Sequence, residues 1–119
     1  MASMTLSDEA LFQIRRGDRW MRERDERRHQ LLAVAQRVAA VLKTEFGATR
    51  VLLFGSLVRP WFHEESDIDL AVEGITPSRQ GEAWDRALDE ANTAVDLVFL
   101  EEAPAPLRER ILLDGRVLD

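Results

Sequence analysis

The sequence predicts a single α/β domain in which a small sheet lies between helices. Two observations lead to this prediction: apolar residues recur at helical spacing in some segments, and short β-branched or aromatic runs bounded by glycine lie between them. With 119 residues, of which 45% are hydrophobic and 32% charged, the chain can fill one core. It has no cysteine, no secretory pattern and no apolar run long enough for a membrane span. We therefore expect a soluble cytoplasmic protein without a membrane partner.

Residues 1–29 are expected to form a largely polar helical extension. Ser7, followed by two acidic residues, is a suitable helix start, and the polar run continues to about Arg28 as one helix or two short ones. Seven arginines between positions 15 and 28 alternate with acidic residues, several at i,i+4 spacing. This pattern favours a solvated helix first, a surface for a protein partner second, and nucleic-acid binding third.

Residues 30–119 are expected to form the domain, which opens with the clearest helix of the chain. Its apolar residues recur at helical spacing and Gly47 follows in a position that ends helices. A largely buried strand is predicted over residues 50–54, closed by Gly55. The apolar positions of the helix are Leu31, Val34, Ala35, Val38, Leu42 and Phe46.

Two further strands and two helices complete the predicted domain. The strands cover residues 67–73 and 94–100, and the helices cover residues 83–91, with Trp84 in the core, and 104–113, ended by Gly115. In a strand, alternate side chains point to opposite faces. Ile68, Leu70 and Val72 therefore share one face in the first of these strands, and Val95, Leu97 and Phe99 share one face in the second.

Three aspartates interrupt these apolar strands. Asp67, Asp69 and Asp96 are each predicted to lie on the face opposite the core residues of their strand. If the two strands are neighbours, the three carboxylates converge, and such a cluster normally exists because a cation holds it; oxygen ligands favour magnesium or manganese. The alternative is that each aspartate merely faces water on the open side of a sheet.

The dipeptide Gly55-Ser56, directly after the first strand, makes the metal interpretation more attractive. A turn with glycine lets backbone N–H groups approach a phosphate, and the serine hydroxyl adds a donor. A phosphate-binding turn beside a metal site is what phosphoryl or nucleotidyl transfer from a nucleoside triphosphate requires.

The run from Gly55 to Val72, GSLVRPWFHEESDIDLAV, resembles the Gly-Ser-x10-Asp-x-Asp signature of the DNA polymerase β-like nucleotidyltransferase superfamily. Asp96 matches the third acidic residue on a later strand. At this chain length the sequence is most similar to the minimal nucleotidyltransferases, antitoxins found beside HEPN-domain toxins. The resemblance implies a palm-like fold with a three- to four-stranded mixed sheet flanked by helices.

The resemblance also implies roles for individual residues. Gly55 and Ser56 would bind the β and γ phosphates of ATP, and Asp67 and Asp69 would ligate two Mg²⁺ ions. Asp96 would hold the catalytic metal and help to deprotonate the acceptor hydroxyl. Arg59 matches a basic position of the minimal group and would contact the triphosphate or the partner; it could equally be a surface arginine.

The function implied is the transfer of AMP from ATP to a hydroxyl group, on a tyrosine, of a cognate HEPN RNase toxin, which neutralises the toxin. Two alternatives stay open: an antitoxin that acts by binding and occlusion alone, and a nucleotidyltransferase that modifies a small molecule or an RNA end. Residues 60–119 carry 15 acidic and 5 basic groups, which disfavours direct binding of nucleic acid. The nucleobase, the number of AMP units added and the oligomeric state are left open by the residues.

Overall fold

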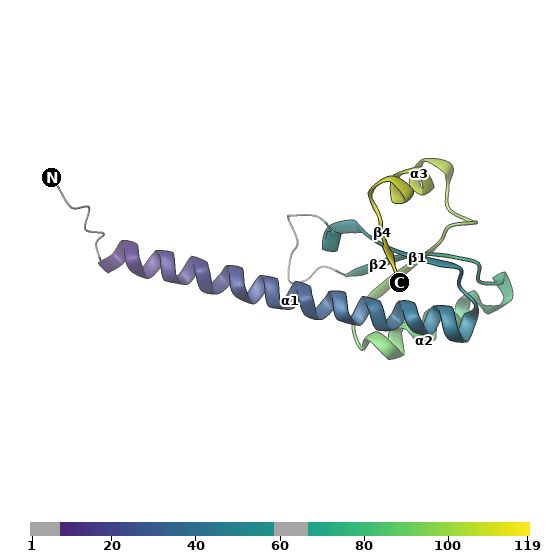
Figure 1. The fold of residues 1–119 in the computed structure, drawn as a ribbon, viewed down its shortest axis with the longest axis horizontal. Coiled ribbons are helices and arrows are strands. Elements are labelled where there is room, and N and C mark those ends of the chain that lie inside the picture. Colours follow the sequence, from purple (N-terminus) through teal and green to yellow (C-terminus); the bar gives the residue numbers. More distant parts are fainter. Residues whose placement is uncertain (1–7, 59–66) are drawn as a thin grey trace.

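The computed structural model describes residues 8–58 and 67–119, with side chains described from residue 23 onward within those ranges. A long N-terminal helix leads into a four-stranded sheet, and the helices pack on the two faces of the sheet (Figure 1). In chain order the elements are α1 (Asp8–Phe46), β1 (Arg50–Phe54), the 3₁₀ turn η1 (Gly55–Val58), β2 (Ile68–Glu73), η2 (Pro77–Arg79), α2 (Gln80–Ala91), β3 (Val95–Phe99), α3 (Ala105–Asp114) and β4 (Arg116–Leu118).

The sheet is mixed, with the strand order β3-β2-β1-β4. Strand β1 is antiparallel to both β2 and β4, whereas β2 and β3 run parallel and are connected through α2. The predicted α/β class and mixed sheet are confirmed. The pattern of the sequence indicated three strands, and β4 is the fourth; its three residues are too few to show an alternation that could be recognised.

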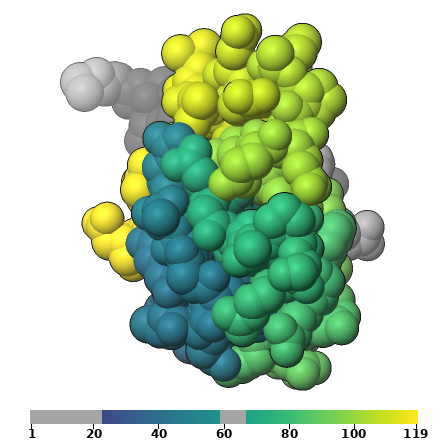
Figure 2. All heavy atoms as spheres, turned by 90° about the vertical axis from the view of Figure 1, so that its right-hand side faces the viewer, coloured from purple at the N-terminus to yellow at the C-terminus, as the bar shows by residue number. Residues whose placement is uncertain are grey.

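One face of the sheet carries the main core. Helices α1 and α2 pack on it, and the residues predicted to share a face in β2 and β3 all contribute: Ile68, Leu70, Val72, Val95, Leu97 and Phe99. Val51 and Leu53 of β1 join them. The opposite face is covered in part by α3, where Ile111 packs with Leu52, Ala71 and Leu100. Figure 2 shows α1 and α2 side by side, with the segment that contains α3 above them.

Helix α1 is a single unbroken helix of 39 residues. The apolar positions predicted for its C-terminal half are buried, except Val34, which is partly buried and packs against the core. Leu31 is the first buried side chain in the described part of the chain, so the segment before it extends beyond the sheet (Figure 1). The helix crosses position 29 without interruption, and the division into an extension of residues 1–29 and a domain of residues 30–119 stays a prediction.

The other helices match the sequence closely. Helix α2 ends where Asn92 adopts a left-handed conformation, and α3 begins after Pro104, as its sequence predicts. In the ranges that the structure describes, no helix combines the length and the hydropathy that crossing a membrane requires.

Candidate active site

Two of the three predicted aspartates occupy directly adjacent positions on neighbouring strands. Asp69 of β2 is the register partner of Asp96 of β3, and on its other side Asp69 faces Phe54, the last residue of β1. Side chains in register on adjacent strands point to the same face of a sheet. The sheet therefore presents Phe54, Asp69 and Asp96 as one row on the face opposite the main core. Asp67 is exposed and immediately precedes β2.

Helix α3 packs on the same face of the sheet, but further along the strands. It packs over Leu52 and Ala71, which form the next row along the strands, and over Leu100 beyond the end of β3. The row of Asp69 and Asp96 lies nearer the start of β2 and β3 and is not part of that cluster. The carboxylates are thus positioned by the two parallel strands, next to the apolar cluster under α3, against which Phe54 of the same row packs.

Gly55 joins the aspartates to the turn that follows β1. Its φ angle is +78°, a conformation that glycine adopts without strain, and a Cβ atom at this position would overlap the Oδ2 atom of Asp69 and lie 3.1 Å from its Cγ atom. Only a residue without a side chain lets the turn approach the carboxylate this closely. The Gly-Ser dipeptide and the Asp-x-Asp motif are therefore parts of one site.

The turn itself is held by the core. Leu57 in η1 is buried among the core residues and Val58 packs against them, while Gly55 and Ser56 are only partly buried. The apolar half of the turn thus fixes the polar half beside Asp69, where the backbone N–H groups of the turn can serve an anionic ligand.

The electrostatics of the site favour a bound cation. Burial of the half-buried side chain, together with the nearby carboxylates of Asp96 and Asp67, raises the pKa of Asp69 to about 6. None of the three forms an ion pair with another residue in the described part of the chain. Negative charges that repel one another without a basic partner are stabilised by a divalent cation.

The carboxylate oxygens of the site fit a Mg²⁺ ion whose coordination is completed by water and by the phosphates of a nucleotide. No group of three or more His, Asp or Glu side chains within residues 23–58 and 67–119 is arranged to hold an ion by itself. Mg²⁺ is commonly bound by one or two carboxylates, with water and substrate phosphates completing its coordination. The pair Asp69 and Asp96, with Asp67 close by, supplies such a partial set of oxygen ligands.

A family model described as polymerase beta, nucleotidyltransferase, matches residues 36–118. The chain belongs to the polymerase β nucleotidyltransferase family. The match begins within α1 and extends through β4, so it includes every strand of the sheet and the whole row of Asp69 and Asp96. A comparison with curated protein sequences finds no significant match.

Solved structures with the same fold include three at 25% identity or more. One, described as a minimal nucleotidyltransferase, has 27% identity and a TM-score of 0.62, over 74% of this chain and 92% of its own. A toxin–antitoxin crystal structure with AMP-PNP has 25% identity and a TM-score of 0.60, over 71% of this chain and 72% of its own. The MntA-HepT toxin–antitoxin structure, at 22% identity and a TM-score of 0.58 over 74% and 71% of the two chains, shows the fold alone.

The remaining predicted site residue of this nucleotidyltransferase, Arg59, lies outside the described residues. Sequence reasoning assigned Gly55 to phosphate binding and missed its second property, the close approach to Asp69. The position of Gly55 at the end of a strand could have indicated this contact, because a glycine in a strand often marks the close approach of a neighbouring group.

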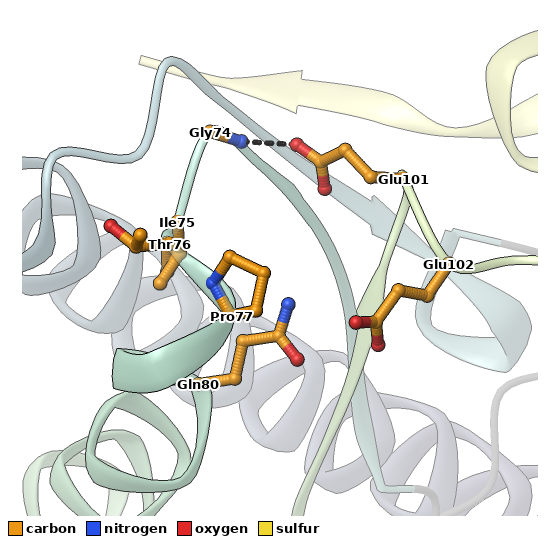
Figure 3. Close-up of a pocket in the computed structure, with 7 residues that line it drawn as sticks. All are labelled: Gly74, Ile75, Thr76, Pro77, Gln80, Glu101 and Glu102. Atoms are coloured by element: carbon orange, nitrogen blue, oxygen red, sulfur yellow. Dashed lines mark hydrogen bonds between the residues drawn. The ribbon is translucent and has the colours of Figure 1, made fainter.

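A surface hollow of about 370 Å³ lies at the opposite end of β2 from Asp69. Figure 3 shows the carboxylate of Glu101 accepting a hydrogen bond of 2.6 Å from the backbone N–H of Gly74, with Glu102, Pro77 and Gln80 around it. The hollow is separated from the row of aspartates by the length of the strand. It is not part of the candidate active site.

Proposed function

We propose that this nucleotidyltransferase is an antitoxin that transfers AMP from ATP to a tyrosine hydroxyl group of a cognate HEPN-domain RNase toxin in the cytoplasm. The observation that carries the chemistry is the placement of Gly55 against Asp69, with Asp96 next to it in register. The likeness to a toxin–antitoxin structure with AMP-PNP, an ATP analogue, supports both the nucleotide and the class of partner.

Each residue of the site has a role in this proposal. Asp67 and Asp69 would hold two Mg²⁺ ions, and Asp96 would hold the catalytic ion. Gly55 and Ser56 bind the β and γ phosphates through backbone N–H groups and the serine hydroxyl. Arg59 contacts the triphosphate or the partner protein.

The reaction is an in-line displacement at the α-phosphorus of ATP. The acceptor hydroxyl oxygen forms a bond to the α-phosphorus, the bond from that phosphorus to the bridging oxygen of the β-phosphate breaks, and pyrophosphate leaves. Asp96 accepts the proton of the hydroxyl group. The turn at Gly55 and Ser56 keeps the leaving phosphates in line with the attacking oxygen. Bound magnesium supplies neutralisation of the triphosphate charge and of the charge that develops on the leaving group.

A second candidate function is neutralisation of the toxin by contact alone, with no transfer of AMP. The three carboxylates form no ion pair with the described residues, which argues against it, because like charges placed side by side destabilise a fold that gains nothing from them. Transfer to a small molecule or to an RNA end is the third candidate, and the acidic balance of residues 60–119 disfavours the RNA.

The test is intact-mass spectrometry of a HEPN toxin co-expressed with this chain. We expect adducts of about one AMP mass, or multiples of it, with the unmodified chain and none with the Asp67→Asn/Asp69→Asn variant. Asp85→Asn/Asp89→Asn is the matched control, because it removes two exposed carboxylates of α2 away from the site and should leave the adducts unchanged. An unmodified toxin in a stable complex would favour neutralisation by occlusion.

A survival assay separates the two modes of neutralisation in cells. If the Asp67→Asn/Asp69→Asn variant still rescued cells from the toxin, catalysis would not be needed for the antitoxin effect. Metal-dependent labelling of RNA without any partner protein would instead support the third candidate.

A further inference from the structure

Strand β3, which carries Asp96, lies at the edge of the sheet and has a neighbour on one side only. The backbone hydrogen bonds at its ends show which residues point to that neighbour. The carbonyl of Ala94 accepts from the N–H of Ile68, and the N–H of Leu100 donates to the carbonyl of Val72. By the alternation of a strand, even-numbered residues of β3 direct their backbone groups toward β2 and odd-numbered residues direct theirs toward the open edge.

Val95 is one of the odd-numbered residues, so no strand within residues 8–58 and 67–119 bonds its carbonyl. The side chain of Trp84 takes that place: its indole N–H donates to the carbonyl oxygen of Val95 at 3.1 Å. The indole ring also packs edge-on against Phe99 at the other end of β3, with 6.4 Å between the ring centroids. Trp84 thus attaches α2 to both ends of the strand.

The carbonyl of Val95 belongs to the same peptide group as the backbone N–H of Asp96. This peptide group is held from two sides, by β2 through the N–H of Asp96 and by Trp84 through the carbonyl of Val95. Because a peptide group is planar, fixing both of its ends fixes its rotation about the strand axis, and with it the direction in which the side chain of Asp96 leaves the backbone.

We propose that Trp84 is a positioning residue for Asp96, acting through the carbonyl of Val95 to hold the Asp96 carboxylate beside Asp69. The inference rests on the proposed function, since it gives Asp96 its role at the metal. Trp84 itself contacts neither nucleotide nor metal. Trp84 lies on the core side of the sheet and the side chain of Asp96 lies on the other face, so Trp84 can affect Asp96 only through the backbone.

The substitution Trp84→Phe tests the proposal, because it keeps an aromatic ring and removes the N–H donor. Leu88→Ala is the control: Leu88 lies one turn further along α2, and its side chain is exposed at the surface. Three quantities are measured for both variants: hydrogen exchange of the Asp96 amide without metal, Mn²⁺ affinity of the free protein, and the kinetics of nucleotidyl transfer.

For Trp84→Phe we expect faster exchange of the Asp96 amide, roughly tenfold weaker Mn²⁺ binding and a kcat lower by about tenfold, as for other residues that orient a metal ligand. The KM for ATP should change less than about twofold, because the phosphates are bound by Gly55 and Ser56. Leu88→Ala should leave all three quantities unchanged. In a background of Asp96→Asn, Trp84→Phe should cause no further loss of Mn²⁺ affinity.

The proposal is overturned if the Asp96 amide of Trp84→Phe exchanges at the same rate as in the unmodified chain and the variant binds Mn²⁺ equally well. It is also overturned if Leu88→Ala weakens Mn²⁺ binding and speeds this exchange as Trp84→Phe does. Should Trp84→Phe fail to fold, benzothienylalanine at position 84 replaces it, because this residue has the shape of tryptophan without the N–H group. An unmodified chain that binds Mn²⁺ and transfers no nucleotide would contradict the proposed function, while the exchange of the Asp96 amide would still decide the role of Trp84.

Discussion

The Cα atom of Gly55 lies so close to the carboxylate of Asp69 that a Cβ atom there would overlap Asp69 Oδ2 and force the Asp69 side chain to move. Gly55 also has a positive φ angle of 78°. Two independent constraints therefore require glycine at this position, one from the backbone and one from the acidic side chain on the neighbouring strand.

Substitution of Gly55 by alanine should separate the phosphate-binding turn from the carboxylates. We expect nucleotidyl transfer to fall by about 100-fold, because a displacement on the order of 1 Å in a reacting geometry has effects of this size. The measurement is the initial rate of transfer, together with thermal unfolding.

Gly47→Ala is the matched control for this substitution. Gly47 has a φ angle of +75°, and a Cβ atom there would meet nothing within 4 Å. Both variants should lose about 1 kcal/mol of stability from the left-handed backbone, and only Gly55→Ala should lose activity. Equal activity in the two variants would show that the contact with Asp69 is unimportant.

The pKa of Asp69 makes the stability of the metal-free protein depend on pH. Burial and the neighbouring Asp96 and Asp67 raise the pKa from 3.8 to about 6 in the folded state. The folded protein then holds this proton more tightly than the unfolded chain does, so the stability that Asp69 contributes is greatest below the unfolded value and is lost as the pH rises through about 6.

Asp69→Asn should therefore be more stable than the unmodified chain at about pH 7.5 without metal, by about 1–2 kcal/mol after allowance for solvent screening of the half-buried group. The two proteins should be nearly equal below about pH 3, where the carboxyl is protonated in both the folded and the unfolded state. Denaturant unfolding in the presence of a chelator measures the difference. Added Mg²⁺ should stabilise the unmodified chain at the higher pH; a difference between the proteins that did not change with pH would contradict the raised pKa.

Removal of residues 1–29 should leave the domain folded. The first buried side chain in the described part of the chain is Leu31, so we expect the free energy of unfolding to change by less than about 1 kcal/mol. Removal of residues 1–36 is the contrasting variant, because it also removes Leu31 and Ala35 and should cost several kcal/mol, as roughly 2–5 kcal/mol accompanies the loss of one buried leucine side chain. Loss of cooperative unfolding in the shorter deletion would show that the extension is part of the domain.

The hollow around Gly74 should be separable from catalysis. Glu101→Ala removes the acceptor of the Gly74 N–H and should cost roughly 0.5–1 kcal/mol, because water can replace the exposed bond. Glu102→Ala removes a side chain in the same hollow that forms no hydrogen bond with the described residues, and it should cost less. Neither change should alter the rate of nucleotidyl transfer; a decrease of about tenfold or more would place the hollow in the active site.

The local periodicity of the sequence was sufficient for much of the fold. The spacing from Leu31 to Phe46 predicted the packed half of α1, and the alternation in β2 and β3 predicted that Asp69 and Asp96 lie opposite the core. These predictions succeed because burial of one face imposes a period of two or 3.6 residues on the chain, and that period can be recognised without knowing what covers the face.

Other features depended on which strands pair. The same alternation is compatible with any order of strands, so it could not determine that β2 lies next to β3 or that Asp69 is in register with Asp96. Strand β4 has three residues, and its place beside β1 is decided by the tertiary structure. The hydrogen bond from Trp84 to Val95 likewise depends on α2 crossing over the start of β3.

The sequence by itself determined the types of residue at the site, the spacing from Gly55 to Asp69 and the face on which Asp69 and Asp96 would lie. Only the tertiary structure decided that the Gly55 turn contacts the carboxylate, that Asp69 and Asp96 are adjacent, and that the charge of Asp69 is disfavoured. The physical reason is the distance along the chain over which each feature is decided. Side-chain alternation depends on residues that are neighbours in the sequence. Strand register, the contact of Gly55 with Asp69 and electrostatic repulsion depend on segments far apart in the sequence that the packing of one core brings together.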